Sequence, residues 1–240
     1  MRQDYFVDNN GVEIHFVVLH QSTTNNTQMP WIMIPGMGNS ADEAIEDLRD
    51  SFPVYQIHIN LRGRGKSDSP DTGYTLNDQV SDIDAVVNKL GLQQFYLYGH
   101  SVGSSIALRY AHLHPQKVAA LAMGDFAPFY PPFDKSWASR TLQNKYLDMS
   151  AKAVNGIAAA AEGYIELSKE LAMLPCPTLL IRGGQKDAFF REENVPHILQ
   201  LVPTMQIELL NNSGHDLLSP SPAAFAKILQ DFANRVATTA

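Results

Sequence analysis

The sequence has a single cysteine, Cys176, so no disulfide bond can form within the chain. Cys176 lies between two prolines with no histidine near it in sequence, and we expect a small packed side chain rather than a nucleophile. No apolar run approaches the roughly eighteen residues that cross a membrane, and residues 1–5 lack the apolar character of a signal peptide. We therefore expect a cytoplasmic protein with no membrane partner.

An excess of positive charge is also absent. The chain has 18 basic and 25 acidic side chains, a formal net charge of -7, so it offers no basic surface for nucleic acid. With 240 residues, 45% of them hydrophobic, the chain can bury one substantial core, whereas two independent domains would be cramped. We predict one domain over residues 1–240.

Short apolar runs alternate with helical patterns from residue 31 onward, which predicts a mostly parallel sheet with helices on both faces. Two further strands, at 5–7 and 12–19, are separated by turn residues and should form an N-terminal antiparallel hairpin. Residues 12–16 alternate between apolar and polar, so we expect a half-exposed strand with His15 in solvent. The fold class is thus α/β with an eight-stranded sheet, whose remaining strands are expected at 31–34, 54–59, 95–98, 118–123, 177–182 and 205–210.

The run Gly99-His100-Ser101-Val102-Gly103 joins the strand at 95–98 to a predicted helix. A serine on such a sharp turn takes a strained backbone conformation, and its neighbours two before and two after must be tiny. The turn presents the hydroxyl near a helix N-terminus, which favours developing negative charge. The motif alone is weak evidence, so a base, an acid and a second oxyanion donor must come from elsewhere.

The loop 35–41 allows two interpretations. Its glycines fit the G-x-G-x-x-A dinucleotide fingerprint, which needs an acidic residue about 20 positions later, at the end of the next strand. That strand ends in Asn60, and no carboxylate follows before Asp68. We favour the second interpretation, in which the backbone N–H of Met37 helps to hold an oxyanion.

The loop 60–68 carries three basic residues between glycines, which is compatible with phosphate binding or with a scaffold role. It lacks the P-loop spacing, so we favour the scaffold.

Residues 126–174 separate two core strands by nearly fifty positions, too many for a plain crossover. We interpret this insertion as a small helical cap. Its aromatic residues either pack between cap and core or line a substrate pocket; the pocket candidates are Phe126, Phe129, Tyr130 and Trp137.

The chain resembles the α/β-hydrolase fold superfamily over nearly its whole length. The resemblance depends on the turn around Ser101, the loops at 35–38 and 62–67, and the sequences around Asp187 and His215. It implies that Ser101 is the nucleophile, Asp187 the acid and His215 the base, in this order along the chain. It also implies that the backbone N–H groups of Met37 and Val102 are the oxyanion donors.

Some members of the superfamily take the acid from the loop before the cap, which makes Asp125 the alternative to Asp187. Many relatives have a histidine where this chain has Pro35, so the oxyanion loop is supported differently here.

These features predict a serine hydrolase that cleaves a small carboxylic ester, a lactone or a thioester through an acyl-serine intermediate. Neither a metal ion nor a cofactor is expected, and the predicted partner is a small-molecule ester. The alternatives are a C–C hydrolase, a cofactor-free oxygenase or perhydrolase, and a ligand-sensing protein that keeps the triad. The oligomeric state and the natural substrate stay open.

Overall fold

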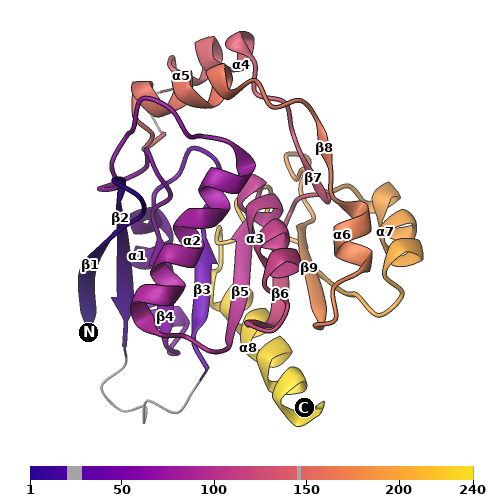
Figure 1. Ribbon diagram of the computed structural model, residues 1–240. Coiled ribbons are helices and arrows are strands. Elements are labelled where there is room, and N and C mark those ends of the chain that lie inside the picture. Colours follow the sequence, from indigo (N-terminus) through magenta and orange to yellow (C-terminus); the bar gives the residue numbers. More distant parts are fainter. Residues whose placement is uncertain (21–28, 145–146, 240) are drawn as a thin grey trace.

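The computed structural model describes residues 1–20, 29–144 and 147–239. Its main sheet has eight strands in the order β1-β2-β4-β3-β5-β6-β9-β10 (Figure 1). The β1–β2 and β2–β4 pairs are antiparallel and all other neighbours in the sheet are parallel, which confirms the predicted fold class. The strands are β1 (Arg2–Asp8), β2 (Glu13–Leu19), β3 (Trp31–Ile34), β4 (Gln56–Ile59), β5 (Phe95–His100), β6 (Val118–Gly124), β9 (Thr178–Gly183) and β10 (Gln206–Leu210).

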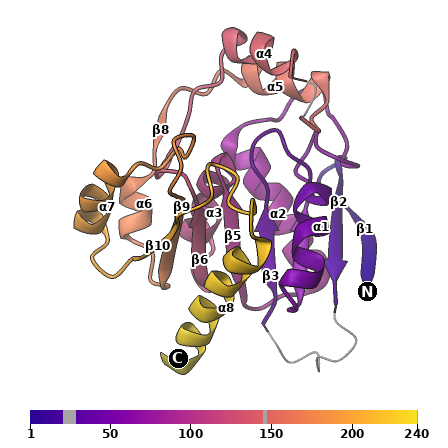
Figure 2. The ribbon, with the colours of Figure 1, turned by 180° about the vertical axis from the view of Figure 1, so that it is seen from behind.

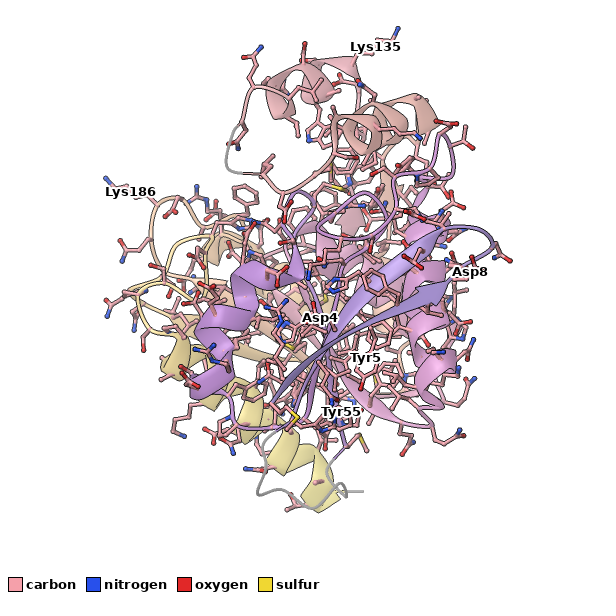
Figure 3. All side chains as sticks on the ribbon, turned by 90° about the vertical axis from the view of Figure 1, so that its left-hand side faces the viewer. Asp4, Tyr5, Asp8, Tyr55, Lys135 and Lys186 are labelled. Atoms are coloured by element: carbon pink, nitrogen blue, oxygen red, sulfur yellow. The ribbon has the colours of Figure 1, made fainter. Side chains whose placement is uncertain are left out.

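Helices cover both faces of this sheet. One face packs against α2 (Leu76–Leu90), α3 (Val102–Leu113), α6 (Ser168–Ala172) and α7 (Val195–Leu201), the last preceded by the 3-10 turn η1 (Glu192–Asn194). The other face packs against α1 (Ala41–Ser51) and α8 (Pro222–Thr239), which lie in front in Figure 2. Figure 3 looks at the β1 edge, where the sheet separates these two layers.

Local sequence explains the clean ends of α2. Thr75 caps the helix by accepting from the Asp78 backbone N–H, and the Asp78 carboxylate accepts from the Thr75 backbone N–H. Such a capping box satisfies two amides that a helix start leaves free. Gly91, in the left-handed conformation at φ 63°, ends the helix. The helix lies within residues 74–90, where apolar residues at helical spacing predict an amphipathic helix.

Strand β2 differs from the prediction of a half-exposed strand. It lies between β1 and β4 in the sheet, and apolar clusters cover both of its faces. His15 is fully buried rather than in solvent. Its ring contacts Asp4 Oδ1 at 2.9 Å and Asn60 Nδ2 at 2.7 Å. These polar partners make the burial of an imidazole tolerable.

The predicted insertion divides into two parts. A small hairpin of β7 (Phe129–Tyr130) and β8 (Ile165–Glu166) brackets α4 (Lys135–Thr141) and α5 (Ala151–Ala160). These two helices lie above the sheet at the top of Figure 1, and Lys135 of α4 lies at the top of Figure 3. The last helix of the segment, α6, packs beside α3 in the helix layer. Of the described helices of the insertion, α4 and α5 thus lie above the sheet, whereas α6 lies beside α3.

Candidate active site

Ser101 lies on a strained turn between β5 and α3. Its backbone has φ 53° and ψ -130°, a region that residues other than glycine rarely adopt. The turn is fixed because the Ser101 N–H donates to the Gly124 carbonyl at 2.8 Å and the Ser104 N–H donates to the Ser101 carbonyl at 2.8 Å. Strain of this kind costs about 1–3 kcal/mol and is typical of functional sites.

The glycines on either side of the serine permit this turn. A Cβ on Gly99 would collide with the Gly103 carbonyl, and a Cβ on Gly103 would collide with the Pro35 carbonyl. Strand, helix and the loop after β3 thus approach one another closely at Ser101. Ser101 itself is 7% exposed.

His215 follows β10 and is held by a buried carboxylate. Its Nδ1 contacts Oδ2 of Asp125 at 2.8 Å. Asp125 comes directly after β6, has a positive φ of 49° and is 0% exposed. A carboxylate accepts at this distance, so Nδ1 carries a proton and Nε2 of a neutral ring is free to accept another.

Backbone amides satisfy the rest of the Asp125 carboxylate. It accepts from the N–H groups of Phe189 at 2.7 Å, Phe190 at 3.2 Å and Gly183 at 3.3 Å. Hydrogen bonds of this kind offset the loss of water around a buried carboxylate. Asp125 is therefore a preorganised acceptor for the Nδ1–H of His215.

The predicted contact between Asp187 and His215 is not the one that forms. Asp187 is exposed, and its carboxylate lies against the backbone of Gly214, the residue before His215. The loop after β9 contributes the backbone N–H groups of Phe189 and Phe190, which donate to Asp125, and not the Asp187 side chain. The neighbouring Lys186 extends away from the molecule in Figure 3. The alternative carboxylate, that of Asp125, contacts the base.

Two aromatic rings flank His215. Phe189 stacks on it with ring centroids 3.7 Å apart and an interplanar angle of 19°, and is itself 60% exposed. The centroid of the His100 ring lies 4.9 Å from the centroid of the His215 ring. Burial, and to a smaller extent charge on His215, lowers the pKa of His100 to about 3. His100 is thus neutral at physiological pH and adds no second positive charge.

The loop after β3 runs beside the turn of Ser101. A Cβ built on Gly36 would lie 3.5 Å from the Ser101 Cβ. The backbone N–H groups of Met37 and Val102 donate to no other residue of the described ranges. Free amides of this kind can receive negative charge. The Met37 carbonyl is engaged, since it accepts from Arg64 Nε at 3.0 Å.

A cavity of about 300 Å³ adjoins His215 on the side of α1 and α8. Its polar lining includes Asn39, Glu43 and Asp216, and its wall includes Gly36. Ser101 is not among the residues that line it.

The four predicted pocket aromatics do not line this cavity. Phe126 packs on Phe129 at 5.0 Å between ring centroids. Tyr130 is 1% exposed, and its hydroxyl accepts from Gln79 Nε2 at 2.8 Å. Trp137 packs on another ring of the insertion at 4.6 Å. The Tyr130–Gln79 hydrogen bond joins the insertion to the core, whereas the two ring contacts lie within the insertion.

Comparisons with known proteins agree with this architecture. A family model described as alpha/beta hydrolase fold matches residues 30–138. Lipase 3 of Moraxella sp. (strain TA144) is 25% identical over 238 residues, which cover 82% of this chain and 75% of the lipase. N-formylmaleamate deformylase of Pseudomonas putida is 24% identical over 220 residues, covering 77% of this chain and 81% of that enzyme.

Among solved structures, an esterase from Exiguobacterium antarcticum superposes with a TM-score of 0.80 at 21% identity, over 97% of this chain and 100% of the esterase. The sheet order and these matches show that the chain has the α/β-hydrolase fold. At this general level it is a hydrolase. Within the described ranges, no helix is both long and apolar enough to cross a membrane.

Proposed function

We propose that the protein hydrolyses a carboxylic ester of a small molecule through an acyl-serine intermediate. One observation carries the proposal: His215 is hydrogen-bonded at 2.8 Å to the buried Asp125, at the sheet edge where the strained turn presents Ser101. A serine hydroxyl becomes a strong nucleophile when an imidazole removes its proton. A carboxylate behind the imidazole orients the ring and stabilises its charged form.

The reaction then follows from the positions of these groups. Ser101 Oγ attacks the carbonyl carbon while Nε2 of His215 takes its proton. The N–H groups of Met37 and Val102 stabilise the oxyanion of the tetrahedral intermediate. The imidazolium returns the proton to the departing alcohol, and a water molecule activated by the same ring releases the acid and restores Ser101.

A second candidate reaction is cleavage of a carbon–nitrogen bond in an acylated amine. It is favoured by the match to a deformylase over 77% of this chain. The same acyl transfer to Ser101 would serve, because only the leaving atom changes. Hydrolysis of a formamide at a rate above that of matched aryl esters would favour this candidate.

Active-site labelling tests the proposed function. We expect a fluorophosphonate probe to label the wild-type protein at Ser101, and short-chain aryl esters to give a burst followed by steady turnover. Ser101→Ala should abolish both. Ser139→Ala removes an exposed hydroxyl on α4 and should leave both intact. Absence of labelling and of turnover in the wild-type protein would refute acyl transfer and favour a non-hydrolytic or ligand-sensing role.

The predicted cytoplasmic location is a further part of this proposal. It agrees with the net charge of -7, which offers no attraction to anionic membranes. Fractionation of cells that express the full chain would test it, and recovery in the membrane fraction would contradict it.

A further inference from the structure

The guanidinium of Arg64 makes an unusual set of contacts behind the oxyanion loop. Arg64 lies after β4 and is 1% exposed. Its Nε donates to the Met37 carbonyl at 3.0 Å, and its Nη2 contacts the Met37 sulfur at 2.8 Å. The same Nη2 donates to Gln79 Oε1 at 2.8 Å, and Nη1 donates to the Arg62 carbonyl at 2.7 Å. Every contact is to a neutral acceptor.

A buried cation without a carboxylate partner is costly. Over the described ranges, Arg64 forms no ion pair, whereas the neighbouring Arg62 pairs with Asp82 at 2.7 Å. Burial lowers the pKa of Arg64 to about 10, so the side chain is still charged at neutral pH. Replacing such a group by an apolar one is often neutral or stabilising for the fold. The contacts of Arg64 are therefore poorly explained by stability alone.

We infer that Arg64 is a positioning residue that holds Met37 as an oxyanion donor. This inference rests on the proposed function. The guanidinium contacts Met37 at two points, the carbonyl and the side-chain sulfur. The carbonyl belongs to the peptide unit after the Met37 Cα and the N–H to the unit before it, so these contacts fix the Cα from which the N–H is oriented. Pro35 contributes no backbone N–H to the same loop, which leaves the loop one internal donor fewer. The fixed plane of an arginine suits this task better than a flexible lysine.

The same cation links the oxyanion loop to the insertion. The backbone of Arg64 pairs with Met149, just before α5. Gln79, which accepts from Arg64, donates through Nε2 to the Tyr130 hydroxyl at 2.8 Å, at the start of the insertion. The connection between α4 and α5 thus contacts Arg64 directly, and the start of the insertion reaches it through Gln79. A shift of the insertion on substrate binding would reach the oxyanion donor through Arg64.

Substitution of Arg64 tests the inference by kinetics. In Arg64→Met we expect kcat for a small aryl ester to fall on the order of tenfold to a hundredfold, with KM nearly unchanged, because only the transition state uses the oxyanion donors. The rate of phosphonate labelling should fall by a similar factor, while the melting temperature stays the same or rises. Lys66→Met, which removes an exposed cation of the same loop, should change none of these.

Arg64→Lys keeps the charge but cannot reach Met37 and Gln79 together, so we expect a smaller loss of kcat, again without a change in KM. This variant decides the matter if Arg64→Met does not fold. A folded Arg64→Met protein with wild-type kcat would overturn the inference, as would wild-type kcat in Arg64→Lys when the methionine variant is unfolded.

Amide hydrogen exchange separates this inference from the proposed function, since it needs no substrate. Peptides that contain residues 36–38 should exchange faster in Arg64→Met than in the wild-type protein, with unchanged exchange in α8. A wild-type protein that neither hydrolyses esters nor reacts with phosphonate would refute the proposed function. Unchanged exchange at residues 36–38 would refute the role of Arg64 whatever the activity.

Discussion

At the scale of single residues, burial and backbone direction decide which carboxylate serves the base. Asp125 and Asp187 both follow core strands at the same sheet edge. Asp125 is fully buried and accepts three backbone N–H groups besides the contact with His215. Asp187 is exposed beside Gly214. A dry, fully hydrogen-bonded anion stabilises an imidazolium far better than a solvated one.

Replacement of the two acids gives a matched test. We expect Asp125→Asn to lower kcat by about 10⁴-fold, because an amide donor opposite Nδ1 favours the wrong tautomer of His215. Asp187→Asn should retain kcat within a few-fold. The measurement is steady-state hydrolysis of an aryl ester, with circular dichroism to show that both variants fold. A larger loss in Asp187→Asn would mean that a loop rearrangement brings Asp187 to the base during turnover.

Burial makes the single cysteine a poor nucleophile. Burial raises the pKa of Cys176 to about 11, so the thiol is protonated at neutral pH. Since the thiolate is the nucleophile, Cys176 does not compete with Ser101 for an acyl group. This agrees with the interpretation of Cys176 as a packed side chain.

At the scale of elements, close contact among strand, helix and loop creates the site. The β5 strand, the α3 helix and the loop after β3 meet where Gly99 and Gly103 leave no room for a side chain. The neighbours at these positions are backbone atoms, which cannot move aside as a flexible side chain can. Ser101, with its positive φ, lies at this contact.

A methyl group at Gly103 should therefore separate the elements. We expect Gly103→Ala to cost about 1–3 kcal/mol of unfolding free energy, because overpacking forces backbone shifts. For a chain of this size this lowers the melting temperature by about 2–4 °C per kcal/mol. Activity should fall as well, since the loop that carries Met37 must move. Differential scanning calorimetry measures the first effect and ester hydrolysis the second.

Gly163→Ala is the control, because a Cβ there meets no atom within 4 Å. It should leave both the melting temperature and the activity unchanged. Equal stability of Gly103→Ala and Gly163→Ala would show that the elements can relax around the turn.

At the scale of the whole molecule, two apolar layers enclose the sheet and bury polar groups within it. His58 on β4 is 1% exposed, and its Nε2 contacts Gln56 Oε1 at 2.8 Å. Burial lowers the pKa of His58 to about 3. The folded protein therefore keeps this ring neutral at pH values where the unfolded chain protonates it.

Stability should fall as the pH drops from about 6.5, the ordinary value, toward 3. Between these pH values the unfolded chain binds a proton at His58 and the folded protein does not. The free energy of unfolding therefore falls by up to about 1.4 kcal/mol per pH unit. We expect His58→Gln, which cannot be protonated, to reduce the difference in melting temperature between pH 7.5 and pH 4.5. His197→Gln, on an exposed part of α7, should leave it unchanged. Identical pH profiles for wild type and His58→Gln would contradict the assignment.

Local chemistry in the sequence determined the order of strands and helices, the turn at Ser101 and the ends of α2. These features depend on neighbours within a few positions: apolar periodicity, small residues beside a serine, a capping pair and a terminal glycine. The fold class and the loops that form the sheet edge followed from them, because the strands of a parallel sheet end on one side.

Only the tertiary structure decided which groups meet across that edge. Asp125 rather than Asp187 contacts His215 because a positive φ at Asp125 and the amides of a loop more than sixty residues later combine to bury it. His15 is buried because its strand lies inside the sheet, and Arg64 meets Met37 because two separate loops fold together. Such contacts join residues far apart in the chain, and no local pattern records them.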